Sequence, residues 1–243
     1  MIGTVGIVVP AHDEEDLLPA CLAALHEAAG AAAAERGVSV RIVVAADTCT
    51  DGTAALARGA GATVVEISDR NVGGARAAGL RELVRGDRPK AGLWLATTDA
   101  DSVVPPNWLT EQLRHADQGW EAVVGTVAVA DWTGHAPATA IEFAREYGAW
   151  RGWHPHVHGA NLGFTAPAYL TAGGFPPLRT AEDHALVSAM HAQGRRVLRA
   201  PDLQVVTSAR RRYRAPEGFG QHLTTLGSDP GPLLGVRGGG GGV

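Results

Sequence analysis

The sequence predicts an α/β fold with a mostly parallel central sheet flanked by helices. Short apolar runs at residues 5–9, 40–46, 62–67 and 93–97 alternate with stretches in which apolar residues recur at helical spacing. Alternation of this kind implies parallel strands joined by right-handed crossovers. Acidic residues follow the first, second and fourth runs, and open α/β sheets bind ligands beyond the carboxyl ends of their strands.

The first part of the chain should supply three helices between these four strands. Pro10 stops the first strand, and a helix then covers about residues 17–36. The acids at 13–16 have a structural explanation, because acids favour the dipole of a first helical turn. The second helix begins at residues 51–53, which suit an N-cap. The third covers 71–84, and its small residues would let it approach a strand or a phosphate closely.

After residue 101 the pattern becomes less regular and predicts a smaller, mixed region. We expect helices at 107–118, around 141–147, at 166–172 and at 180–194, and extended segments at 122–129, 159–164, 196–200 and 203–207. Glycines and prolines at 173–177 mark a turn before the last helix.

Composition excludes some partners and compartments. The 243 residues carry a formal net charge of −4, which gives no whole-chain attraction to nucleic acid. The two cysteines, Cys21 and Cys49, lack metal-ligand spacing and favour a reducing compartment. No charged-then-apolar leader opens the chain, and no uncharged apolar run approaches the ~20 residues that span a bilayer. We therefore expect a soluble, cytoplasmic protein.

Two carboxylates, Asp99 and Asp101, end the fourth apolar run. Hard oxygen ligands at that edge can hold Mg²⁺ or Mn²⁺, and substrate phosphates can complete the coordination. The pair also has a simpler interpretation, because Asp-x-Asp is common by chance. It then marks only the polar end of a strand, ahead of a helix that starts after Pro105 and Pro106.

Several segments in order resemble the family 2 glycosyltransferases. They are residues 9–15 (VPAHDEE), 47–53 (DTCTDGT), 71–79 (NVGGARAAG), 99–101 (DAD), 173–175 (GGF) and 182–183 (ED). The resemblance covers roughly residues 4–190 and implies the GT-A fold. Within that domain it implies a nucleotide-sugar-binding half at 1–103 and an acceptor-binding, catalytic half at 104–226. Low complexity predicts a flexible Gly-rich tail at 227–243.

The resemblance implies donor contacts from three segments. Pro10, Ala11 and Glu14 match the edge of the nucleotide pocket, with Glu14 as a contact to the nucleoside. Asp47 matches the acid that hydrogen-bonds the uracil ring, and Arg76 matches a basic residue that lies against the nucleotide. A carboxylate suits the first task, because a pyrimidine edge offers an N–H.

The resemblance also assigns the metal and the base. Asp99, Ala100 and Asp101 match the metal motif, with Asp101 as the main ligand for Mg²⁺ or Mn²⁺ and Asp99 beside ribose or metal. Asp183 matches the catalytic base, and Glu182 lies next to it. A carboxylate there can take the proton from an acceptor hydroxyl.

Asp183 also has an alternative structural interpretation. Thr180 and an acid three residues later resemble a capping box, so Asp183 could serve only to stabilise a helix start.

Two further groups of residues could contact a ligand. His154, His156 and His158 alternate at strand spacing, which would place them on one face as transition-metal ligands, an acceptor pocket or a solvated loop. From their position, His158 and Asn161 are candidates to touch the acceptor. The second group, arginines 195, 196, 199, 210, 211, 212 and 214, could form a solvated face, bind a donor or acceptor phosphate, or touch an anionic membrane surface.

The resulting prediction is a metal-dependent, non-processive, inverting glycosyltransferase that moves a sugar from a UDP-type donor to a hydroxyl acceptor. Its partners are the nucleotide-sugar donor and a small or lipid-linked acceptor. The Gln-x-x-Arg-Trp motif of processive synthases is absent, and Thr165-Ala166 stand where the family often has paired arginines. Two alternative functions stay open. A sugar nucleotidyltransferase would normally carry a Gly-rich loop and a lysine soon after the first strand, and this sequence has neither. A non-catalytic nucleotide-sugar-binding module would lack the base, and Glu182 and Asp183 argue against it.

Overall fold

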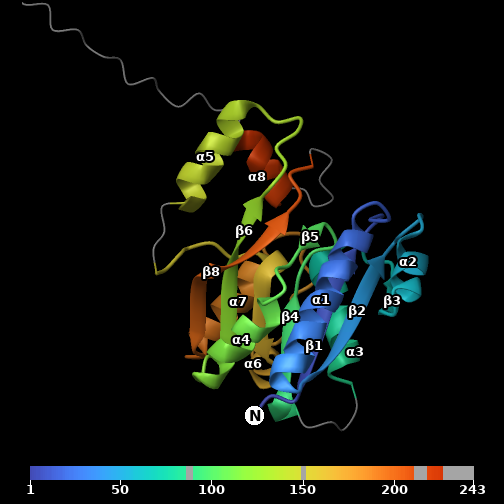
Figure 1. Cartoon of the computed structure of the whole chain (residues 1–243), viewed down its shortest axis with the longest axis vertical. Helices are drawn as coiled ribbons and strands as arrows, with labels where there is room; N and C mark the ends of the chain where they lie inside the picture. The colour runs from blue at the N-terminus through green and yellow to red at the C-terminus, as the bar shows by residue number, and fades with distance from the viewer. Residues whose placement is uncertain (86–89, 149–151, 211–217, 227–243) are drawn as a thin grey trace, which may run out of the picture.

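The computed structural model describes residues 1–85, 90–148, 152–210 and 218–226. This part of the chain contains one eight-stranded sheet in the order β3-β2-β1-β4-β7-β6-β8-β5, with helices on both faces (Figure 1). The prediction of an α/β fold is confirmed. The sheet runs continuously through both predicted halves, and a boundary at residue 103 stays a prediction.

The first four strands are parallel to one another. They are β1 (Thr4–Ala11), β2 (Ser39–Asp47), β3 (Thr63–Ile67) and β4 (Leu93–Thr97), with β1 between β2 and β4. The connections contain α1 (Leu18–Arg36), α2 (Thr53–Gly59), α3 (Val72–Leu83) and the short 3-10 helix η1 (Lys90–Gly92). Every residue of β4 is buried, as expected of a strand covered on both faces.

The remaining strands mix both directions. They are β5 (Ser102–Val103), β6 (Ala122–Val129), β7 (Leu162–Thr165) and β8 (Val197–Thr207). β7 lies antiparallel between β4 and β6, while β8 runs parallel to β6 and antiparallel to β5. The two extended pieces predicted near the end form one strand, whose pairing with β6 continues past Pro201 after a register shift between Val124 and Thr126.

The helices of this second part are α4 (Trp108–Asp117), α5 (Pro137–Gly148), α6 (Ala166–Thr171), α7 (Glu182–Ala192) and α8 (Phe219–Leu226). The strand expected at 159–164 begins only at Leu162, since residues 159–161 form the short 3-10 helix η2 (Gly159–Asn161). The Gly-rich tail predicted at 227–243 lies outside the described residues.

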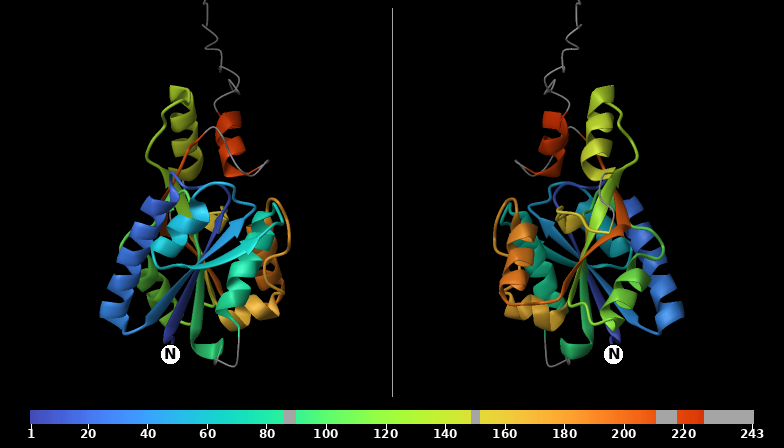
Figure 2. Two further views of the ribbon diagram at one scale, coloured as in Figure 1. Left: turned by 90° about the vertical axis from the view of Figure 1, so that its right-hand side faces the viewer. Right: turned by 90° about the vertical axis from the view of Figure 1, so that its left-hand side faces the viewer.

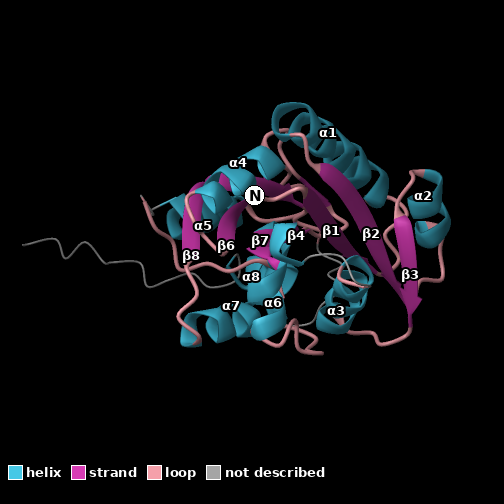
Figure 3. Ribbon diagram, turned by 90° about the horizontal axis from the view of Figure 1, so that it is seen from below, coloured by secondary structure: helices cyan, strands magenta, loops and turns pink. Residues whose placement is uncertain are grey.

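Two apolar layers enclose the sheet. One layer contains α1 and α4, and the other contains α3, α6 and α7 (Figure 3). Gly79 lets α3 lie close to the sheet, because a Cβ at this position would overlap the side chain of Val8. The prediction that small residues bring this helix against a strand is confirmed.

Helices α5 and α8 pack on each other beyond one end of the sheet (Figure 2). Phe143 and Leu223 are buried between them, and Ala209 completes this small cluster. None of the described helices is long and apolar enough to cross a membrane.

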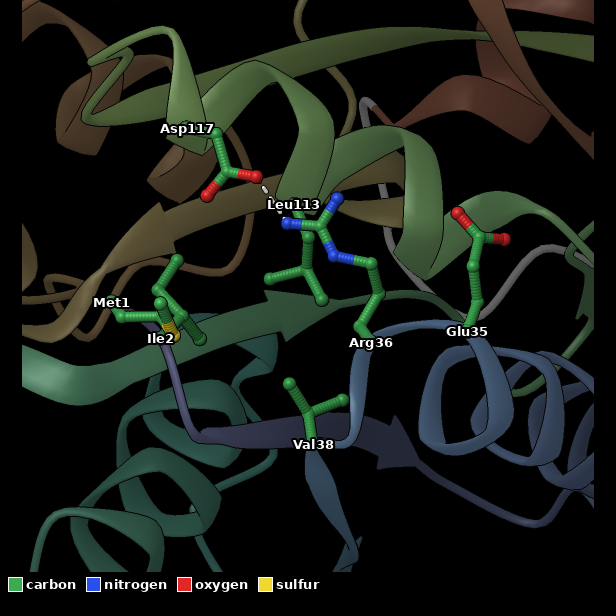
Figure 4. A pocket seen from close by; sticks show the side chains of 7 residues that line it. All are labelled: Met1, Ile2, Glu35, Arg36, Val38, Leu113 and Asp117. Carbon is green, nitrogen blue, oxygen red and sulfur yellow. Dashed lines mark hydrogen bonds and ion pairs between the residues drawn. The ribbon is translucent and has the colours of Figure 1, made fainter.

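A shallow hollow of about 400 Å³ lies at the amino end of β1, between α1 and α4 (Figure 4). Met1, Ile2 and Val38 line its floor, and Arg36 and Asp117 form an ion pair across its wall. Parallel sheets bind ligands at the opposite, carboxyl ends of their strands, so the functional site is expected there.

Candidate active site

The carboxyl ends of β1 and β4 meet the start of α7 at a dense group of charged side chains. Its members come from five segments and are connected through two arginines: Glu14, Arg76, Asp99, Asp101, Glu182, Asp183 and Arg210. Most of them were predicted as site residues. Pro10 and Ala11 are buried at the end of β1, and Ala100 is buried between the two β4 carboxylates.

Arg76 lies at the centre of the buried half of this site. Its guanidinium donates to Glu182 and Asp99, and its Nε donates to Thr97 Oγ1 at 3.2 Å. The side chain is 3% exposed and fits against Gly159, where a Cβ would overlap the guanidinium. Burial alone would lower the pKa of Arg76, but the nearby charges, led by Asp99 and Glu182, raise it above its ordinary value. Arg76 therefore keeps its positive charge, and its three partners hold the guanidinium in place.

The two acids at the start of α7 have different environments. Glu182 is 3% exposed and pairs with Arg76. Asp183 lies nearer the surface, where Oδ2 accepts from the backbone N–H of Gly159 at 2.7 Å and Oδ1 from that of His184 at 2.7 Å. Asp183 is thus the more accessible of the two predicted catalytic acids.

The alternative capping box at this helix does not form. Ala181 is the N-cap residue, with a left-handed φ of 59° and no side-chain cap hydrogen bond. Asp183 is then the second residue of the helix, so it cannot be the third residue of a box that starts at Thr180. Its bond to Gly159 instead connects α7 to η2 and the loop before it.

Arg210 joins the other acids of the site. It donates to both carboxylate oxygens of Glu14, and its Nη2 lies 3.1 Å from Asp101 Oδ2. The backbone of Glu14 is held as well, since its N–H donates to Thr53 Oγ1 at 2.7 Å. The predicted nucleoside contact and the predicted main metal ligand are therefore held by one guanidinium.

Asp101 is suited to bind a cation. Burial raises its pKa to about 7, and the negative charges of Asp99 and Glu14 add to this effect although Arg210 opposes it. A carboxylate whose charge is under-compensated gains from a divalent ion, and Asp99 lies two positions away in the same segment after β4. The donor set thus fits Mg²⁺ or Mn²⁺, which prefer oxygen ligands.

Asp47 organises the loop before α3. Oδ1 accepts from the backbone N–H groups of Asp69 and Arg70 at 2.9 Å each, and Oδ2 accepts from that of Asn71 at 2.7 Å. Burial alone would raise the pKa of Asp47, but these N–H groups and the hydroxyl of Thr48 outweigh it and lower the pKa. The predicted contact of Asp47 with a uracil ring stays a prediction, and its observed role is to shape this loop.

A second acidic group lies beside the site. Single ligand atoms from Asp13, Cys49 and Asp51 lie within 4.8 Å of one another. Both acids already have backbone partners: Asp13 accepts from Thr50 N at 2.7 Å, and Asp51 accepts from Glu15 N at 3.1 Å. Through these bonds, the group connects the loop that follows β1 to the loop that follows β2.

Asn161 has a structural role that removes it from the acceptor candidates. Its side chain is 0% exposed. Nδ2 donates to the carbonyl oxygens of Thr126 and Leu203 at 2.8 Å each, and Oδ1 accepts from Trp108 Nε1 at 2.9 Å. Asn161 therefore joins β6, β8 and α4, and it is not open to an acceptor.

The three histidines do lie in one row, as their spacing predicted. Neighbouring rings are 6.2 and 6.0 Å apart, and His156 stacks on Tyr147 at 4.0 Å. His158 is half-buried, and Tyr147 Oη lies 3.2 Å from its Nε2. Burial lowers the pKa of His158 to about 3, so the ring is neutral at pH 7. Because it adjoins Gly159 and hence Asp183, His158 stays an acceptor candidate.

The described arginines of the predicted cluster have separate functions. Arg195 pairs with Glu121 at 3.0 Å, Arg196 lies over the ring of Trp120, and Arg199 donates to the carbonyl oxygens of residues 155 and 156. These three arginines do not form a common phosphate site, and among the described arginines of the cluster only Arg210 contacts the site acids Glu14 and Asp101. Arg211, Arg212 and Arg214 lie outside the described residues.

Comparison with known proteins identifies the family and the fold of this chain. The family model described as Glycosyl transferase family 2 matches residues 6–171. Three solved structures share the fold: S. aureus TarS in complex with UDP-GlcNAc, the mannosyltransferase PcManGT from Pyrobaculum calidifontis with GDP-Man and Mn²⁺, and glucosyl-3-phosphoglycerate synthase from Mycobacterium tuberculosis with phosphoglyceric acid. A search of curated proteins found no match.

The sequence identities to these structures are low, but the structural similarity extends over most of this chain. The TM-scores are 0.62 for TarS, 0.64 for PcManGT and 0.55 for the synthase, at 14%, 23% and 16% identity. The alignments cover 87%, 93% and 87% of this chain, and 60%, 70% and 73% of those chains. The chain thus spans 60% of the TarS fragment, and the likeness establishes a shared fold.

Proposed function

Because the chain belongs to glycosyl transferase family 2, we propose that it is a metal-dependent, non-processive, inverting glycosyltransferase. The donor is a nucleotide sugar of the UDP type, and the acceptor is a hydroxyl on a small or lipid-linked molecule. One observation carries the proposal: Arg76 bonds to Asp99 at the end of β4 and to Glu182 at the start of α7. This network brings the candidate metal ligands and the candidate base to one place.

The donor side uses the ends of the parallel strands. Glu14 follows β1 and Asp47 ends β2, where the nucleoside would bind against Pro10 and Ala11. Asp99 and Asp101 would hold Mg²⁺ or Mn²⁺, and a bound ion would neutralise the charge that develops on the leaving diphosphate. The UDP-type donor is supported by TarS, which was solved with UDP-GlcNAc. Because PcManGT was solved with GDP-Man, the test below also includes donors with a guanine base.

Asp183 would take the proton from the acceptor hydroxyl. It belongs to α7 and not to a donor strand, which suits inversion, because direct displacement needs the base opposite the leaving group. Glu182 is already bound to Arg76, and its proposed role is to hold that arginine in place. His158, one residue from the amide that binds Asp183, would line the acceptor side.

A donor panel tests the reaction class. Purified protein is incubated with UDP- and GDP-sugars, candidate acceptors and Mg²⁺ or Mn²⁺, and the products are separated. Release of the nucleoside diphosphate with sugar transfer supports the proposal. Release of pyrophosphate from a sugar phosphate and UTP would indicate a nucleotidyltransferase, and binding without turnover would indicate a binding module.

A cytoplasmic location also stays a proposal, supported by the free thiols of Cys21 and Cys49.

A further inference from the structure

The pairing of β5 with β8 fixes the position of Arg210. Ser102, the residue after Asp101, pairs with Thr207, and their hydroxyls lie 3.0 Å apart. Ala209 is 5% exposed, packs in the cluster of α5 and α8, and accepts from His135 through its carbonyl oxygen. The chain is thus anchored immediately before Arg210, three residues beyond the strand that pairs beside Asp101.

The guanidinium of Arg210 occupies the path between two predicted parts of the donor site. Glu14 follows β1 and Asp101 follows β4, which are neighbours in the sheet. Arg210 contacts both acids, and these contacts use three of the five N–H donors of a guanidinium. In a nucleotide sugar the diphosphate lies between the nucleoside and the sugar and is the part that a divalent ion binds. If the nucleoside binds at Glu14 and the ion at Asp101, the diphosphate would lie near the guanidinium that contacts both.

The charges around Asp101 favour an exchange of partners. Glu14 and Asp99 act on Asp101 as like charges, and Arg210 is the cation that counters the charge of Asp101, whereas Asp99 pairs with Arg76. If Asp101 holds a divalent ion, its contact with Arg210 competes with that ion. The guanidinium would then be released from one carboxylate and could donate its planar pair of N–H groups to a phosphate.

We propose that Arg210 is the diphosphate-binding residue of the donor site and competes with the divalent cation for Asp101. This assignment rests on the proposed function. In the absence of donor, Arg210 weakens cation binding by occupying Asp101. When donor and cation bind together, Arg210 moves from Asp101 to a phosphate oxygen, so cation and donor each favour the binding of the other.

The test compares two arginine-to-glutamine variants by calorimetry. Arg210→Gln removes the proposed contact. Arg195→Gln is the matched control, because Arg195 is similarly exposed (28% against 25%) and pairs with Glu121 away from the site. For each variant and the wild type, the affinity for Mn²⁺ alone is measured, followed by the affinity for UDP at saturating Mn²⁺. Thermal melting verifies that each variant is folded.

The proposal predicts two changes of opposite sign. Arg210→Gln should bind Mn²⁺ alone more tightly, by about tenfold, and UDP more weakly, by about 10- to 100-fold, as expected for a lost charged hydrogen bond. Arg195→Gln should change neither affinity, and Arg210→Lys, which keeps the charge but not the planar fork, should keep the wild-type Mn²⁺ affinity and lose part of the UDP affinity. Such a pattern cannot arise from a structural role, which would lower both affinities.

Three results would overturn the proposal. Weaker binding of both ligands to Arg210→Gln would leave Arg210 a purely structural role. Unchanged UDP affinity would remove the diphosphate contact. If the wild type binds neither UDP nor GDP at any Mn²⁺ concentration, the proposed function fails together with the diphosphate contact, while the affinities for Mn²⁺ alone still decide whether Arg210 competes for Asp101.

Discussion

Arg76 on α3 and Glu182 on α7 form a buried ion pair between residues 106 positions apart in the sequence. Both side chains are 3–4% exposed. The pair connects the strand-end acids of the donor side to the helix that carries Asp183, because Arg76 also bonds to Asp99. An ion pair in this position fixes the distance between two candidate catalytic groups, and several expectations depend on it.

Replacing Glu182 should reduce stability more than any single change to Asp183. Glu182→Ala leaves Arg76 buried with one fewer carboxylate, and breaking a buried pair in this way typically costs about 3–5 kcal/mol. Glu182→Gln should cost less, because its amide oxygen can still accept from Arg76. Urea unfolding measures both free energies. A loss below about 1 kcal/mol for Glu182→Ala would show that Arg76 does not need this partner.

Gly159→Ala should displace Arg76. A Cβ there would overlap a guanidinium that Thr97, Asp99 and Glu182 hold in place, so the expected loss of stability is about 1–3 kcal/mol. Gly30→Ala is the control, since it lies in α1 with nothing within 4 Å of the added methyl, and it should stabilise the protein by about 0.5–1 kcal/mol. Equal effects of the two changes would contradict the close packing of Arg76 on Gly159.

Asp183→Asn should separate catalysis from structure. Asparagine has one acceptor oxygen, so it keeps only one of the two amide bonds to Gly159 and His184, and stability should fall by about 1 kcal/mol. Loss of a general base typically lowers the rate by about 10²–10⁴-fold, whereas the affinity for UDP should hardly change. Single-turnover transfer and calorimetry measure the two quantities. A rate within a few-fold of wild type would exclude Asp183 as the base.

Asp47 should make stability depend on pH in the acidic range. Its pKa is lower in the folded state than in the unfolded chain, so its contribution is fully present above about pH 4 and disappears as the pH falls through the folded-state pKa. Asp47→Asn should therefore destabilise the protein at pH 7, by about 2 kcal/mol for the lost charged hydrogen bonds, and less at pH 3. A constant difference between wild type and variant from pH 7 to pH 3 would contradict this.

The place of the strand-end acids was predictable from sequence, because they lie at or directly after strands. Asp47, Asp99 and Asp101 come at or just after the ends of apolar runs, and parallel strands bring such ends to one edge. The capping-box alternative at Thr180 failed because capping depends on the local backbone. Ala181 adopts a left-handed conformation that the sequence did not indicate.

Contacts between distant segments were not predictable in the same way. Nothing near Arg210 in the sequence distinguishes it from Arg195 or Arg196, and only the pairing of β5 with β8 brings it to Asp101. The position of Asn161 near His158 predicted an acceptor contact, but its amide donates to carbonyl groups of β6 and β8 beside the register shift between these strands. The positions of Arg210 and Asn161 both depend on how distant strands pair, and local sequence patterns do not determine this pairing.

Binding of UDP and GDP, with and without Mn²⁺, to the wild type, Asp101→Asn and Asp99→Asn tests the central claim most directly. The account predicts that Mn²⁺ strengthens nucleotide binding to the wild type. It also predicts that Asp101→Asn loses most of this gain and that Asp99→Asn loses less. Calorimetry measures each affinity, and melting temperatures verify the folds. Equal metal-dependent binding of UDP by the wild type and Asp101→Asn would contradict the assignment of the donor and metal site to the end of β4.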